Sequence, residues 1–375
     1  MQRRIYADHA ATTKLDAFAF EAMKPYLLEA YGNASQLYSF ARQPKMALEK
    51  ARKTIADCIG SAPEEIYFTS GGTESDNWAI KGSAFLDTEH RATITSAFEH
   101  HAVLRSCQMI EKLGFPVVYL MPSSSGVVEP DCIRKVITDR TRLVSIMFAN
   151  NEIGTVQPIQ TLAEIAHQHG AVFHTDAVQA VGHVDINVKT LGVDMLSASA
   201  HKFNGPKGVG FLYVKKGVAI HPFFDGGAQE KTLRAGTENI AGIVGMAAAL
   251  QGNCEAIEER TEHLKSLEAC FMEDLAETGL DYIRNGNDHH LPGIISISFK
   301  NADGEAILHR LDLMGISVST GSACNSSSIA LSHVIEAIRV PREYAYGTIR
   351  MSLGYENTKE EVKTIVRAFC KVLLP

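Results

Sequence analysis

The 375-residue sequence has no long block of lysine or arginine, and its formal net charge is -7. A protein that binds nucleic acid or an anionic membrane needs a basic face, so neither partner is expected. The N-terminus carries Arg3 and Arg4 without an apolar stretch after them, which is not the pattern of a secretory signal peptide. The longest weakly polar run, residues 240–250, is too short to span a bilayer.

Cysteine pairs at Cys-x-x-Cys spacing are also absent, and the seven cysteines are scattered along the chain. An odd number of scattered thiols is typical of a reducing compartment, so we expect a soluble, cytoplasmic protein. The sequence shows neither an internal repeat nor a proline- or serine-rich linker. With 45% hydrophobic and 21% charged residues, the composition is that of a globular protein long enough for two domains.

Apolar strand-like runs alternate with helical patterns from about residue 15 to residue 255, which predicts βα units around a mostly parallel sheet. The clearest strands are residues 66–69, 143–148, 171–174, 195–198 and 211–214. A long charged helix with one apolar face follows at residues 257–275, and two further strands lie at 295–299 and 348–352. We therefore expect a large domain of residues 13–255 and a smaller α+β domain of residues 1–12 and 256–375.

Polar residues follow the predicted strands, where open α/β sheets bind their ligands. In residues 69–75 (TSGGTES), glycines and a helix N-terminus favour an anion, although an ordinary strand–helix turn is the alternative. Asp176 ends a buried strand, so it needs a partner such as a protonated pyridine nitrogen, or it caps a helix. Lys202 follows another strand and is either a solvated lysine or a Schiff-base amine, with Ser199 and His201 placed to hold a phosphate.

A run of small residues, 319–328, surrounds Cys324 and predicts an exposed, mobile loop. An exposed thiol on such a loop suits a nucleophile that visits a site and leaves it, whereas the alternative is an incidental surface cysteine. The other six cysteines lie in helical or strand-like surroundings and are expected to pack in the interior. No metal site is expected, because the histidine pairs 167/169 and 289/290 lack cysteine or carboxylate partners at ligand spacing.

Taken together, these segments resemble the cysteine desulfurases of the NifS/IscS type, within the class V aminotransferases. The resemblance runs from residues 7–13 (ADHAATT) to residues 349–354 (IRMSLG), and the sequence GSAC at 321–324 separates desulfurases from most relatives in the class. It implies the α/β fold of the fold type I pyridoxal-phosphate transferases. It also implies a pyridoxal 5'-phosphate enzyme that converts L-cysteine to L-alanine.

The resemblance also implies a role for each matching residue. Lys202 would bind the cofactor as a Schiff base, Asp176 would pair with its ring nitrogen, His100 would stack on the ring and relay protons, and Cys324 would receive the sulfur as a persulfide. The phosphate would be held by Gly72, Thr73, Ser199, His201 and Thr237. Thr237 would come from the neighbouring subunit, which implies a homodimer. Asn151 and Gln179 would lie near the ring hydroxyl and the substrate, Arg350 would bind the substrate carboxylate, and His101 would be structural.

The sulfur acceptor implied by the family is a protein such as an iron–sulfur scaffold, and Cys324 could touch a nascent cluster on it. A tRNA-thiolation protein is the other acceptor implied. Three positions depart from the family pattern, Ala34, Tyr38 and Ala41, and we expect them near the substrate entrance. The competing activities are those of a selenocysteine lyase or another class V aminotransferase, although a loop cysteine has no use in an aminotransferase. A scaffold without catalysis is a further alternative.

Overall fold

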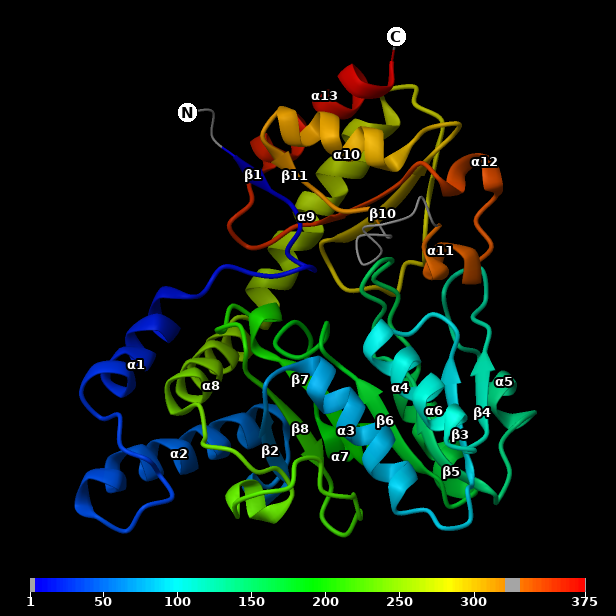
Figure 1. The fold of residues 1–375 in the computed structure, drawn as a ribbon. Coiled ribbons are helices and arrows are strands. Elements are labelled where there is room, and N and C mark those ends of the chain that lie inside the picture. The colour runs from blue at the N-terminus through cyan, green and yellow to red at the C-terminus, as the bar shows by residue number, and fades with distance from the viewer. Residues whose placement is uncertain (1–3, 321–330, 375) are drawn as a thin grey trace.

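The computed structural model describes residues 4–320 and 331–374, and its larger part is built on a seven-stranded sheet (Figure 1). In spatial order the strands are β2 (Ile66–Thr69), β8 (Gly210–Val214), β7 (Met195–Ser199), β6 (Val172–Asp176), β5 (Thr141–Ser145), β3 (Ala92–Ser96) and β4 (Val117–Leu120). From β7 to β4 all neighbours are parallel, whereas β8 runs antiparallel to both β7 and β2. The predicted mostly parallel central sheet is therefore confirmed.

Strand β5 ends three residues earlier than predicted. Residues 143–148 are uniformly apolar after Ser145, so the sequence gives no sign of an end. In the structure the backbone N–H of Met147 donates to both carboxyl oxygens of Glu99, at 3.0 Å each. The carboxyl group of Glu99 thus accepts the hydrogen bond that a neighbouring strand would otherwise accept at this point.

Helices that precede, connect and follow the strands pack around the sheet (Figure 1). They are α1 (Ala17–Leu28), α2 (Arg42–Ile59), α3 (Gly72–Phe85), α4 (His101–Lys112), α5 (Pro130–Arg134), α6 (Ile159–Gln168), α7 (Val188–Leu191) and α8 (Ile240–Glu255). Helix α3 lies against β7 and β8 and packs on α4, while α1 and α2 pack on α8. In α6 the buried residues Leu162, Ile165 and Ala166 form one face, and Gly170 follows its end at a φ of 71°.

The upper part of Figure 1 holds two small sheets and the remaining helices. One sheet is antiparallel, in the order β12 (Thr348–Ser352), β10 (Ile294–Phe299) and β9 (Tyr282–Arg284), and the other pairs β1 (Ile5–Tyr6) with β11 (Ile316–Ser317). The helices are α9 (Ile257–Ala276), α10 (Gly304–Leu313), α11 (His333–Ala337), α12 (Arg342–Ala345) and α13 (Lys359–Leu373). The chain therefore returns to its own N-terminus, because β1 at the start pairs with β11 near the end.

The apolar interior is divided between these two parts. One cluster joins residues 5–7 to residues 267–372 and includes Phe271, Ile297 and Phe369. Another fills the space around the large sheet, and it also receives residues of α11 and α12, which follow much later in the sequence. Helix α11 thus packs on the larger part, whereas α12 contributes Ala345 to this cluster and also packs on β10.

Within the described part of the chain, no single helix is long and apolar enough to cross a membrane. Helices α8 and α9 meet those criteria of length and composition only as a pair, and they are bent by 70° relative to each other.

Candidate active site

A cavity of ≈ 680 Å³ lies at the carboxyl ends of the parallel strands, where the sequence predicted a ligand site. Its wall contains every predicted site residue that the structure describes, apart from Thr237: Gly72, Thr73, His100, Asn151, Asp176, Gln179, Ser199, His201, Lys202 and Arg350. Cys324 lies outside the described residues. The strand order explains the gathering, because β2, β5, β6 and β7 all end at this edge of the sheet.

Lys202 follows β7 and its amine lies against the N-terminal segment of the chain. Its Nζ donates to the backbone oxygens of Ala10 at 2.5 Å and Ala11 at 2.9 Å. Gln179 Nε2 donates to the same oxygen of Ala10, at 2.9 Å. The N-terminal segment therefore covers the lysine and holds its amine in the cavity wall.

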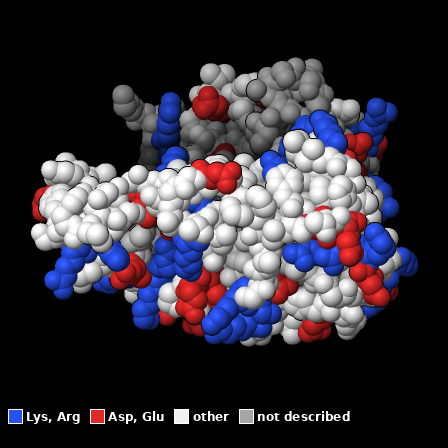
Figure 2. Space-filling view, turned by 60° about the horizontal axis from the view of Figure 1, so that its bottom comes forward, with Lys and Arg blue, Asp and Glu red and all other residues white. Residues whose placement is uncertain are grey.

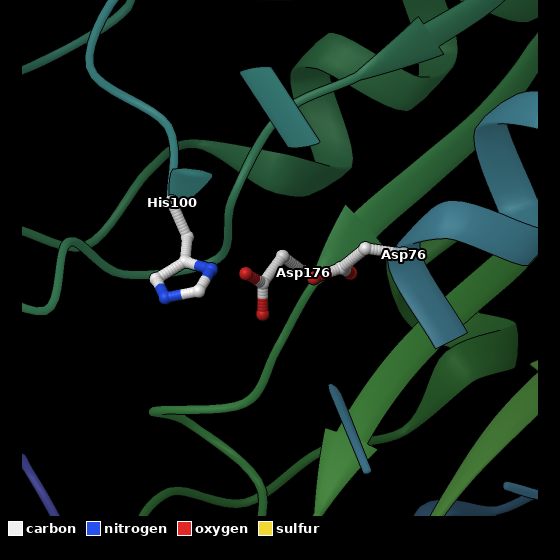
Figure 3. Close-up of side chains that lie close together, drawn as sticks. All are labelled: Asp76, His100 and Asp176. Atoms are coloured by element: carbon white, nitrogen blue, oxygen red, sulfur yellow. The ribbon is translucent and has the colours of Figure 1, made fainter. Parts of the chain in front are cut away.

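His100 and Asp176 face each other across the cavity (Figure 3). His100 caps α4, where its Nδ1 accepts a hydrogen bond from Ala102 N at 3.1 Å. Asp176 Oδ1 accepts a hydrogen bond from Val178 N at 2.9 Å, and the next helix is capped by Asn187 instead. Asp176 is thus not a helix cap. Burial lowers the pKa of His100 and raises the pKa of Asp176.

The end of the cavity beside α3 is suited to an anion. Gly71 has a φ of 149°, which favours glycine, and a Cβ on Gly72 would lie 2.5 Å from Val178 Cγ2. The backbone can therefore approach a ligand closely at the N-terminus of α3, where N–H groups point outward. His201 lies in the same wall, and burial, followed by the nearby lysines, lowers its pKa to about 4.

Arg350 on β12 is buried and partly committed to the protein. Its Nη2 donates to Asp8 Oδ1 at 2.6 Å, and its Nη1 donates to the backbone oxygen of Asn151 at 3.1 Å. Its Nε is buried and has no hydrogen-bond partner among the described residues. A guanidinium held in this way can still bind a carboxylate that enters the cavity.

Acidic residues of the site that were not predicted include Asp8, Asp76 and Glu152, which line the cavity, and Glu99, whose carboxyl group accepts a hydrogen bond from Met147 of its wall. Burial raises the pKa of Glu99 to about 8 and that of Glu152 to about 7. Each of the four lies inside or beside a segment that already carried a predicted residue, such as Glu99 before His100. Their position next to predicted residues was the signal that the sequence offered. Their burial depends on packing, which that signal does not show.

The described flanks of the Cys324 segment reach the cavity from both sides. Ser319 and Arg350 exchange two backbone hydrogen bonds, at 2.7 and 3.0 Å. On the other flank, Ser332 Oγ donates to Glu152 at 2.6 Å, and His333 Nε2 lies 2.9 Å from the backbone oxygen of Glu99. Ser319, Thr320 and His333 all line the cavity.

Thr237, His101 and the three residues that depart from the family pattern lie at different positions relative to the cavity wall. Thr237 is exposed and does not line this chain's cavity. Ala34, Tyr38 and Ala41 do not line it either, so the expectation that they flank the substrate entrance is not met within one chain. His101, expected to be structural, lies in the cavity wall with its ring 4.7 Å from that of His333.

The histidine pairs have carboxylate neighbours in space, although the sequence places no such partner at ligand spacing. His167 Nε2 lies 2.7 Å from Asp194 and His290 Nε2 lies 2.7 Å from Glu268. Both carboxylates are distant in the sequence, so ligand spacing could not reveal them.

The fold and this site define a class V aminotransferase, whose family model matches residues 5–365. The chain is 51% identical over 364 residues to the cysteine desulfurase IscS of Dictyoglomus turgidum, covering 96% of this chain and 92% of the relative. It is 47% identical to the cysteine desulfurase IscS of Methanosarcina thermophila, covering 99% and 92%.

Solved structures agree with these relatives. A NifS-like protein superposes with a TM-score of 0.93 at 38% identity and 99% coverage of both chains. SspA in complex with cysteine superposes with a TM-score of 0.84 at 36% identity, covering 94% of this chain and 100% of that chain. The chain therefore belongs to the class V aminotransferase family and, within it, to the cysteine desulfurases of the NifS/IscS type. The family members are pyridoxal-phosphate enzymes, and cysteine is their substrate.

Proposed function

We propose that this chain converts L-cysteine to L-alanine and carries the sulfur as a persulfide on Cys324. The observation that carries the proposal is the gathering of the predicted residues around one cavity, with both flanks of the Cys324 segment in its wall. Cys324 comes four residues after Thr320, and four residues span at most about 14 Å. The thiol can therefore reach a substrate bound in the cavity.

The cofactor proposed for this cavity is pyridoxal 5'-phosphate, and the residues present fit it. Gly72 and Thr73 at the N-terminus of α3 would hold the phosphate together with Ser199 and His201, where the side chain of Val178 leaves no room for a Cβ at Gly72. Lys202 would bind the cofactor covalently. A buried carboxylate, Asp176, suits a protonated ring nitrogen. When bound, the cofactor stores the electron pair released at the α-carbon of the substrate.

The chain's own residues would supply the remaining chemistry. Arg350 would bind the substrate carboxylate, while Asn151 and Gln179 would orient the substrate and the cofactor. The amine of Lys202 or the neutral imidazole of His100 would accept the α-proton. The Cys324 thiolate would then attack the substrate sulfur, so that a sulfur–sulfur bond forms and the carbon–sulfur bond breaks. The electron pair of the broken bond stays with the amino acid, which takes up one proton at the β-carbon and another at the α-carbon and leaves as alanine.

The proposed assembly is a homodimer in which Thr237 of one subunit contacts the phosphate bound by the other. Large apolar side chains are exposed on one lobe formed by α1, the following loop and the start of α2: Phe18, Phe20, Leu27, Leu28, Tyr31, Leu37, Tyr38, Phe40 and Met46. Figure 2 shows this lobe at the left as mostly uncharged. A contiguous apolar surface of this kind is typical of a protein–protein interface.

The division into domains, the location and the acceptor are also proposals. We propose domains of residues 13–255 and of residues 1–12 with 256–375. The second domain has an apolar cluster of its own, although its helices α11 and α12 also contribute residues to the cluster around the large sheet. Six cysteines of the described chain are free thiols, which supports a reducing compartment such as the cytoplasm.

The persulfide would be passed to an acceptor protein such as an iron–sulfur scaffold.

Replacing Cys324 by alanine tests the proposal. Cys324→Ala should keep the visible absorption of the bound cofactor but lose turnover of L-cysteine, because the nucleophile is gone. Cys270→Ala is the matched control, since Cys270 is a free, partly exposed thiol of α9 outside the cavity. Full alanine and sulfide release by Cys324→Ala would overturn the role given to this thiol.

A further inference from the structure

Asp76 is a carboxyl group of α3 that points into the floor of the site and has almost no contact with solvent. It is 1% exposed and lies next to Asp176 (Figure 3). One carboxyl oxygen of each aspartate and a ring nitrogen of His100 all lie within 4.8 Å of one another. Oδ1 of Asp76 has no hydrogen-bond partner among the described residues. A charged carboxylate without donors is very costly in such a place.

Asp76 has fewer hydrogen-bond donors than the buried carboxyl group of Glu99. Glu99 is equally buried, and its carboxyl group accepts hydrogen bonds from Ser96 Oγ at 2.5 Å and from Met147 N at 3.0 Å. Among the residues that the structure describes, Asp76 has only the Ser197 hydroxyl as a donor. Hydrogen bonds to a carboxylate stabilise its charged form, so the lack of them favours the acid.

No cation compensates Asp76 on the side of β6. His174 is fully buried, and burial lowers its pKa to about 3, so the ring is neutral. Its Nε2 is 3.7 Å from Asp76 Oδ1, too far for a hydrogen bond, and lies 3.0 Å from Ser197 Oγ instead. The remaining charged neighbours are Asp176 and Glu99. Burial, followed by Asp176, raises the pKa of Asp76 well above its usual range.

We propose that Asp76 is a positioning residue that keeps its proton, so that Asp176 is the single carboxylate facing the ring nitrogen of the cofactor. The proposal rests on the proposed cofactor. The physical reason is charge balance: one carboxylate neutralises one protonated ring nitrogen, whereas a second carboxylate would stay unpaired in a dry cavity. Asp76 therefore acts on the cofactor through Asp176, whose charge is favoured by the hydrogen bond from Val178 N and by the nearby amine of Lys202.

The test compares matched carboxyl-to-amide changes at the two positions in the holoenzyme. Asp76→Asn replaces a neutral acid by a neutral amide of the same shape, so we expect the cofactor dissociation constant to stay within about twofold of the wild type. Asp176→Asn removes the charge of a buried ion pair and should weaken cofactor binding at least about 30-fold. The infrared difference between wild type and Asp76→Asn should contain the carbonyl stretch of a protonated carboxylic acid.

Ser197→Ala allows a second infrared measurement, in a variant that retains Asp76. Removing the hydroxyl donor should shift the acid carbonyl band of Asp76 without abolishing it. Carboxylate bands in place of the acid band, an acid band unmoved in Ser197→Ala, or equal weakening by Asp76→Asn and Asp176→Asn would each overturn the proposal. Failure of all these proteins to bind pyridoxal phosphate would instead contradict the proposed function, because the infrared reading of Asp76 needs no cofactor.

Discussion

Replacing Arg350 by lysine keeps a positive charge in the cavity but removes the planar pair of donors that a carboxylate binds in two places. Arg350 is 7% exposed and is oriented by Asp8 and by the backbone of Asn151, while its Nε has no described partner. We expect the substrate carboxylate to receive two hydrogen bonds from the guanidinium and one from a lysine. A hydrogen bond between charged groups contributes about 1.5–3 kcal/mol.

Losing one such bond should lower kcat/KM for L-cysteine by about 10- to 150-fold, since 1.4 kcal/mol is a factor of ten. Alanine at this position would lose both bonds and leave Asp8 as a repelling charge, so the loss should be at least about 150-fold. The assay is steady-state turnover, with the cofactor absorption recorded to confirm loading. Arg342→Lys, an exposed change on α12, is the control. A wild-type KM and kcat in Arg350→Lys would refute the assignment.

Three further predictions concern the base, the phosphate end and the dimer. The lowered pKa of His100 keeps its imidazole neutral to more acidic pH, so the acid limb of the kcat/KM profile should lie below the usual histidine pKa of about 6.5. His100→Gln should remove that limb. An unchanged limb in the variant would show that another group produces it. Gly72→Ala should weaken cofactor binding measurably in a titration. Gly252→Ala, with no atom within 4 Å of the added Cβ, should bind the cofactor normally and gain about 0.5–1 kcal/mol of stability. Equal cofactor affinities of the two variants would contradict the tight approach at Gly72. Leu37→Glu should shift the protein towards monomer in a sizing experiment, whereas Leu313→Glu, on another exposed leucine in α10, should not. Identical elution of the two variants would argue against the proposed interface.

Much of the fold follows from local pattern in the sequence. Strands β2 and β12 begin and end as predicted, because their apolar runs are bounded by residues that change the pattern. The gathering of Asp176 and Lys202 follows from parallel strands whose carboxyl ends meet at one edge. Once the alternation of strands and helices was recognised, this part of the site could be expected from chain order alone.

The rest depends on contacts that no local pattern encodes. Asp8 and Arg350 form an ion pair across 342 positions, which brings the start of the chain onto a strand near its end. Asp76 lies one turn beyond the glycine loop, where an acidic residue would usually face water. Its burial results from the packing of α3 against β7. Sequence spacing therefore found the residues on strand ends and missed the acids that packing brings to them.

The central claim is tested most directly by giving the purified holoenzyme L-cysteine with a thiol reductant and quantifying alanine and sulfide in the same sample. We expect equal amounts of both, together with a persulfide on Cys324 when the reductant is left out. Bound cofactor without alanine, or alanine released with no sulfur on Cys324, would contradict it.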